Sequence, residues 1–140
     1  MGGSLEGLGQ ASRIAATFTF MTRPLVVKVT CGTEDSERCN QAFTVAATAL
    51  TSGATVSLWM TGEAAWFALP GRAEEFWLPK AAPLAELLTA LVEDAQVTVC
   101  TQCAARREID ENDVIPGIRI AGAALFAEEI LQPDVQALVY

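Results

Sequence analysis

Two cysteines three residues apart end the apolar segment VTVCTQC, residues 97–103, and two arginines follow them. If a helix begins just after Cys100, Cys103 lies in its first turn, where unpaired backbone N–H groups and the helix dipole favour a thiolate. Arg106 and Arg107 are three and four residues beyond Cys103 and add positive charge on the same side. Because the thiolate is the reactive form of cysteine, this spacing predicts nucleophilic sulfur chemistry.

The same pair is compatible with other kinds of site. A zinc site needs two further ligands, which Cys31 and Cys39 could supply only if Cys39 turned toward the same edge of the sheet. Cys39 falls on the apolar stripe of a predicted helix, where a free cysteine behaves as a small hydrophobic residue. A thiol–disulfide pair remains an alternative, although CTQC lacks the Gly and Pro that are usual between thioredoxin cysteines. We therefore expect no metal and no cofactor, and take Cys100 and Cys103, with Arg106 and Arg107 close by, as the candidate reactive group.

Composition narrows the function classes. The chain has 140 residues, enough for one domain with a core, and its formal net charge is −8, which argues against direct binding of a nucleic-acid backbone. It contains no histidine, so Ser-His and Cys-His dyads and His-ligated metals are excluded. Apolar stretches are too short to span a membrane, and no secretory signal is recognisable. Its four cysteines are expected to be reduced thiols in the cytoplasm.

Short β-branched runs alternate with helical patterns along the chain. This alternation predicts an α/β fold, a mainly parallel sheet with helices on both faces. The segment at 72–83 is rich in turn formers and is expected to be a loop or sheet edge. Strands are expected at 25–30, 55–60, 96–100, 118–122 and 135–140, and helices at 36–50, 61–69, 84–92, 103–109 and 123–131.

Parallel strands end at a common edge of the sheet, and sites of open α/β sheets lie beyond that edge. Cys31 directly follows the first predicted strand, and Cys100 ends the third. Both cysteines are thus expected at the carboxyl edge. Whether Cys31 takes part in the chemistry stays open.

Aromatic residues crowd into the middle of the chain, at Trp59, Trp66, Phe67, Phe76 and Trp77. Their spacing is too irregular to bury every ring in a small core. Since Trp and Phe are enriched in subunit interfaces, we expect part of residues 59–78 to be buried between subunits.

The first 20 residues precede a second methionine, Met21, which stands just before the first predicted strand. We expect residues 1–20 to be an N-terminal extension without fixed structure and residues 21–140 to form the domain. The alternative is a short docking helix at residues 12–18.

Five segments, LVVKVT, NQAFTVAATAL, VSLWMTGEA, VTVCTQCAARREI and GIRIAGAALFAEEI, occur in an order that resembles the DsrE/DsrF-like family, which includes TusD-type and YchN-type sulfur-relay proteins. The resemblance covers roughly residues 24–140. It implies a three-layer α/β/α domain with a five-stranded parallel sheet, assembled as trimers or hexamers. It also implies a cysteine that accepts persulfide sulfur from one protein and passes it to another.

The resemblance assigns the sulfur-accepting position to Cys100, with Arg106 following and Cys103 as the second cysteine of a C-x-x-C form. The sequence departs from the family where Arg107-Glu108 replaces a frequent Arg-Gly, and its aromatic segment is richer than in a typical relay subunit. Three functions follow as hypotheses: a sulfur-relay protein, a non-enzymatic oligomeric interaction module, and a dithiol redox protein.

Overall fold

The structure is a computed structural model that describes residues 22–140, and the expectations for residues 1–20 lie outside this range. Five strands form one all-parallel sheet in the order β4-β3-β2-β1-β5. They are β1 (Leu25–Val29), β2 (Val56–Met60), β3 (Gln96–Cys100), β4 (Ile118–Ala121) and β5 (Gln136–Val139). The helices are η1 (Thr33–Asp35), α2 (Ser36–Thr51), η2 (Gly62–Ala68), α3 (Arg72–Glu75), α4 (Leu84–Asp94), α5 (Thr101–Arg106) and α6 (Ala123–Ile130).

The main core lies between the sheet and the helices α2 and α4. Side chains alternate along a strand, so every second residue faces this layer. These positions are fully buried and apolar: Val27, Val29, Leu58, Met60, Val97 and Val99. Helix α2 contributes Phe43 and α4 contributes Leu91, both with no exposed surface. This layer accounts for the β-branched strands that the sequence displays.

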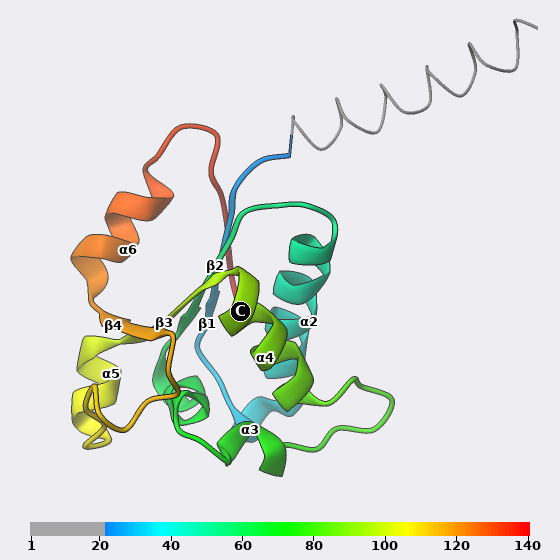
Figure 1. Ribbon diagram of the computed structural model, residues 1–140, viewed down its shortest axis with the longest axis vertical. Helices are drawn as coiled ribbons and strands as arrows, with labels where there is room; N and C mark the ends of the chain where they lie inside the picture. The colour runs from blue at the N-terminus through cyan, green and yellow to red at the C-terminus, as the bar shows by residue number, and fades with distance from the viewer. Residues whose placement is uncertain (1–21) are drawn as a thin grey trace, which may run out of the picture.

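Helix α6 lies on the opposite face of the sheet, as Figure 1 shows, and makes the domain a three-layer α/β/α structure. The side chains below it are mixed: Lys28 and Ser57 are partly exposed, whereas Trp59 and Thr98 are buried. None of the residues of α6 is itself fully buried. This face is therefore a thinner and more polar layer than the core around α2.

The predicted α/β fold is confirmed, and the strand positions agree to within about a residue at each end. The short helix expected at 61–69 is present as a 3-10 helix over residues 62–68. Two local expectations were wrong. The expected loop at 72–83 begins with the short helix α3. The helix after β3 begins at Thr101, two residues before the predicted start.

Most of the aromatic segment is internal to the chain. Phe67 packs edge-on against Phe43 and Phe76, with ring centroids 5.9 and 5.8 Å apart, and thereby ties η2 and the segment after α3 to the core. Trp77 alone of the five predicted aromatics is largely exposed, at 77%. An interface role within residues 59–78 stays a prediction that rests on Trp77. Within residues 22–140 no helix is long and apolar enough to cross a bilayer.

Candidate functional site

Cys100 stands at the carboxyl edge of the sheet, as the last residue of β3 and the N-cap of α5. Its side chain is partly exposed, whereas the other three cysteines are buried. Two residues earlier in β3, the hydroxyl of Thr98 accepts a hydrogen bond from Arg119 on the α6 side of the sheet. Because side chains alternate along a strand, Cys100 projects to that same face. Figure 1 shows α5 and α3 gathered at this edge.

The surroundings of Cys100 favour its thiolate. Partial burial alone would raise the pKa of this thiol. Hydrogen bonds with the backbone and side chain of Cys103 and with the backbone of Gln102 lower it by more, and the positive charge of Lys28 adds to the lowering. The net result is a pKa below the usual range of a cysteine. Thiolate character at an accessible position is what a sulfur nucleophile needs.

Cys103 is buried below Cys100, on the third residue of α5. The backbone N–H of Gly62 donates a hydrogen bond to its Sγ at 3.2 Å. The thiol of Cys103 also interacts with the thiol of Cys100. The structure therefore brings the two predicted cysteines together, with Cys100 toward solvent and Cys103 beneath it.

Gly62 reaches Cys103 because η2 packs directly on the end of β1. Gly62 has a φ of +53°, and a Cβ at this position would clash with the carbonyl oxygen of Thr30. A Cβ on Gly32 would come within 2.9 Å of the carbonyl oxygen of Glu63. Only glycine permits this approach of the two backbones. The pair of glycines thus sets the position of the N–H group that holds Cys103.

The two arginines after the cysteine pair lie in different environments. Arg106, proposed to hold the anionic sulfur, has an exposed side chain with no hydrogen bond or ion pair to the described residues. Arg107 folds back instead: it donates to the carbonyl oxygen of Cys103 at 3.0 Å and lies 3.6 Å from the carboxylate of Glu63. Its guanidinium also lies 5.8 Å from the ring centroid of Trp66. Arg107 therefore braces α5 against η2 and leaves the sulfur itself uncontacted.

Cys31 and Cys39 belong to the α2 side of the sheet. Cys39 has no exposed surface, and the pKa of its thiol is raised to about 12. Burial is the main cause, and the proximity of Cys31 is the second. Burial and the charges of Asp35 and Glu34 likewise raise the pKa of Cys31. Cys31 lies at the carboxyl edge, as the sequence predicts, but on the opposite face of the sheet from Cys100. The raised pKa values keep the thiols of Cys31 and Cys39 protonated. Within residues 22–140, His, Cys, Asp and Glu side chains form no cluster that could hold a metal.

The pocket beside η2 is small. Its volume is about 80 Å³, far below the ~300 Å³ at which small-molecule sites begin. Cys100 is partly exposed and is not among the residues that line this pocket, so its thiol can be approached from the surface of the protein. The pocket is lined by Thr33, Glu63, Trp66, Phe67, Arg72, Glu75 and Phe76.

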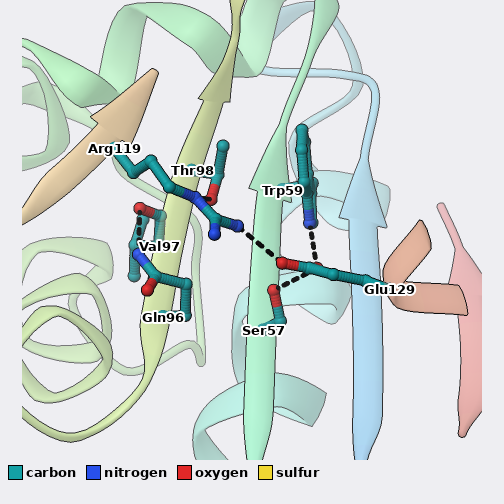
Figure 2. A network of polar contacts seen from close by, with 7 residues as sticks. All are labelled: Ser57, Trp59, Gln96, Val97, Thr98, Arg119 and Glu129. Carbon is teal, nitrogen blue, oxygen red and sulfur yellow. Dashed lines mark hydrogen bonds and ion pairs between the residues drawn. The ribbon is translucent and has the colours of Figure 1, made fainter. Parts of the chain in front are cut away.

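A polar network connects helix α6 to strands β2, β3 and β4, as Figure 2 shows. Glu129 of α6 accepts hydrogen bonds from Ser57 at 2.9 Å and from the indole N–H of Trp59 at 2.8 Å. Arg119 of β4 forms an ion pair with the same carboxylate at 2.6 Å and donates to Thr98 at 2.9 Å. Burial would raise the pKa of Glu129, but Arg119, Trp59 and Ser57 together hold it below the usual range.

Sequence reasoning missed this network and missed Lys28. A signal was present: Lys28 and Arg119 are charged residues inside short apolar strand segments. Their meaning depends on strand pairing, which places Lys28 opposite Trp59, Trp59 opposite Thr98, and Thr98 opposite Arg119. One row of side chains therefore crosses four strands beneath α6.

A model of the DsrE/DsrF-like family matches residues 25–136. None of the curated proteins gave a significant sequence match. Several solved structures share the fold, including the following two. The YchN protein from E. coli superposes with a TM-score of 0.71 at 18% identity, over 85% of this chain and 100% of that one. A protein of unknown function from Methanobacterium thermoautotrophicum, MTH1491, superposes with a TM-score of 0.64 at 6% identity, over 84% and 99% of the two chains.

Proposed function

Because the chain belongs to the DsrE/DsrF-like family, we propose that it is a sulfur-relay protein that carries persulfide sulfur on Cys100. The observation that carries the proposal is the state of its cysteines. Cys100 is the accessible thiol of the four and has a lowered pKa, whereas the thiols of Cys31 and Cys39 have raised ones. A relay cysteine must be reached by a partner and must react as a thiolate.

The transfer is an exchange between sulfur atoms. The thiolate of Cys100 attacks the outer sulfur of a persulfide on a donor protein. A new S–S bond forms at Cys100 while the S–S bond of the donor breaks, and the donor sulfur leaves as a thiolate. One persulfide is consumed and one is formed, so no oxidant or reductant is needed. Delivery to the thiolate of an acceptor protein is the same reaction in reverse.

In this scheme Cys103 is an assisting residue. Its thiol interacts with that of Cys100, and its own Sγ is held by Gly62 N–H. The scheme needs no metal or cofactor. The partners are a protein sulfur donor and a protein acceptor, and the location that suits a reduced thiol is the cytoplasm.

We also propose that the chain works as a homo-oligomer, a trimer or a hexamer. Helix α6 itself has no fully buried residue, and Leu131 and Val139 at that side are 80% and 65% exposed. Trp77 adds an exposed aromatic side chain elsewhere on the surface. Light scattering at micromolar concentration tests this: a chain that stays monomeric contradicts the oligomer.

Persulfide loading tests the relay function. The full chain is incubated with a cysteine desulfurase and cysteine, and intact-mass spectrometry is expected to show the gain of one sulfur atom. Cys100→Ser should abolish the gain, Cys103→Ser should reduce it, and Cys31→Ser should leave it unchanged. Failure of the wild-type chain to load, or equal loading of Cys100→Ser, would overturn the proposal and leave the interaction module of the same fold.

A dithiol redox function is the second candidate, and the interaction between the thiols of Cys100 and Cys103 favours it. Here the two thiols would form a disulfide and reduce a partner disulfide to two thiols. A redox titration separates the two functions. A reversible Cys100–Cys103 disulfide with a potential near that of the cytosolic thiol pool supports the redox protein, and its absence supports the relay.

A further inference from the structure

Lys28 lies on the same face of the sheet as Cys100. Strand pairing places Lys28 opposite Trp59 and Trp59 opposite Thr98. Cys100 is two residues beyond Thr98 in β3, so its side chain and that of Lys28 project to the α6 face, one row apart. Strand β2 lies between β1 and β3, so Lys28 acts on Cys100 across one intervening strand, through its charge.

The ammonium group of Lys28 is held in a defined position by an aromatic ring. Its Nζ lies 5.0 Å from the centroid of the Phe126 ring of α6, within the range of a cation–π interaction. That ring packs edge-on against Trp59, with centroids 5.3 Å apart. The lysine is partly buried between the sheet and α6. The charge is therefore held near the sheet surface.

No carboxylate neutralises this charge among the described residues. The ion pairs within residues 22–140 are made by Arg38, Arg107 and Arg119, and Lys28 takes part in none of them. Glu129 is the acid of α6 that points at the sheet. Its carboxylate already forms an ion pair with Arg119 and accepts hydrogen bonds from Trp59 and Ser57. The network in Figure 2 thus satisfies the acid and leaves the lysine available for another anion.

We propose that Lys28 is the positioning residue that attracts and holds the anionic sulfur of Cys100 and of the species that reacts there. This inference rests on the proposed relay function and replaces Arg106 in the role that the sequence suggested. The ligand class is a small anion centred on sulfur, namely a thiolate or a deprotonated persulfide. The lowered pKa of Cys100, to which the charge of Lys28 contributes, agrees with the geometry.

The charged and titratable groups around Cys100 are few. Cys103 lies beneath it on α5, Lys28 faces it from β1, and the charges of η2 and the α5 end, Glu63 and Arg107, are paired with each other. Arg119 and Glu129 are likewise paired deeper on the same face. Lys28 and the exposed Arg106 make no ion pair among the described residues, and of these two only Lys28 contributes to the lowered pKa of Cys100.

The test compares two alkylating reagents, anionic iodoacetate and neutral iodoacetamide, on the full chain. Rates at Cys100 are followed by peptide mass spectrometry across a pH series. Lys28→Met should lower the iodoacetate-to-iodoacetamide rate ratio about two- to fivefold, the effect of one exposed charge pair. It should also move the pH midpoint of the iodoacetamide rate upward. Lys28→Arg should restore both values.

Lys80 provides the matched control, since it is the only other lysine and is exposed on a loop. Lys80→Met changes the net charge equally and should leave the ratio unchanged. Arg106→Met should also leave it unchanged, and a fall there equal to that of Lys28→Met would return the role to Arg106. If Lys28→Met does not fold, the wild-type chain still decides: raising salt from about 0.02 M to about 0.5 M should lower the ratio by screening.

Persulfide loading separates this inference from the function it rests on. Slower loading of Lys28→Met, with Lys28→Arg restored, supports both. An unchanged reagent ratio and unchanged loading in Lys28→Met overturn the role of Lys28 while the relay function stands. A wild-type chain that never loads overturns the relay function, and the reagent ratio then still reports whether Lys28 attracts anions to Cys100.

Discussion

The backbone N–H of Gly62 donates a hydrogen bond to the Sγ of Cys103 at 3.2 Å, although the two residues are 41 positions apart in the chain. Cys103, the buried cysteine of the pair, is thus oriented by η2. This helix lies in the connection between β2 and β3, whereas Cys103 lies in the connection between β3 and β4. The reactive cysteine, Cys100, depends in turn on Cys103 for part of its thiolate stabilisation. A change at Gly62 is therefore expected to reach Cys100 through one intermediate residue.

Gly62→Ala should destabilise the fold by about 1–3 kcal/mol, because the new Cβ meets the carbonyl oxygen of Thr30 in a left-handed backbone conformation. Gly71→Ala is the matched control: Gly71 also has a positive φ, but a Cβ there meets nothing within 4 Å. Urea unfolding of both variants gives the difference. Equal losses in the two variants would show that the contact with Thr30 has no energetic role.

Arg107→Met should cost about 1 kcal/mol, since it removes the hydrogen bond to the carbonyl of Cys103 and the ion pair to Glu63. Arg106→Met should change the free energy of unfolding by less than about 0.5 kcal/mol, as for other exposed substitutions. Thermal or urea unfolding measures both. A larger loss in Arg106→Met than in Arg107→Met would contradict the placement of the two side chains.

Stability should fall at alkaline pH through Cys39. Its folded-state pKa is about 12, whereas an unfolded cysteine titrates near ~8.5. The folded chain keeps a proton that the unfolded chain loses, so the stabilising term is complete below ~8.5 and declines by about 1.4 kcal/mol per pH unit above it. Urea unfolding between about pH 8 and 10 measures the slope.

Cys39→Ala should flatten that alkaline slope, at the cost of a small cavity worth about 1 kcal/mol at neutral pH. Part of the slope should remain, because the pKa of Cys31 is raised as well. A variant with the full wild-type slope would show that Cys39 is ionised as easily in the folded chain as in the unfolded one.

Glu129 should make the fold sensitive to acid. Its pKa is lowered in the folded chain, so its contribution is complete above the unfolded value of about 4.3 and is lost as pH falls through the folded value. Glu129→Gln should cost about 1–3 kcal/mol at neutral pH by leaving Arg119 without its carboxylate, and should remove this acid-dependent loss. Glu128→Gln, at the exposed neighbouring position, should do neither. Circular dichroism from about pH 7 to 3 follows all three chains.

Much of the fold was predictable because it depends on local patterns. Val27 and Val29, like Val97 and Val99, are β-branched residues in short apolar runs. Such runs predict buried strands without knowledge of which strands they pair with. The 3-10 geometry of η2 was not predictable in this way. It goes with a positive φ at Gly62 and a contact with the end of β1, and both are set by the packed structure.

The site was predictable as far as it lies within one segment. Cys100 and Cys103 are close in sequence, and the helix that begins after Cys100 makes them neighbours in space. Which arginine turns toward η2 could not be predicted, because it depends on where α5 ends: Arg107 is the C-cap and turns back toward Glu63. Lys28 could not be found, since its relation to Cys100 requires the order and register of three strands.

The sheet order has a consequence for how the chain assembles during synthesis. Strand β1 lies between β2 and β5, and its pairing with β5 joins Leu25 to Gln136. Strands β1 to β4 can assemble in the order in which they leave the ribosome, but one edge of β1 stays unpaired until residues 136–139 emerge. An unpaired strand edge readily pairs with another chain. Nascent or C-terminally shortened chains are therefore the forms in which this domain is most exposed to strand exchange and aggregation.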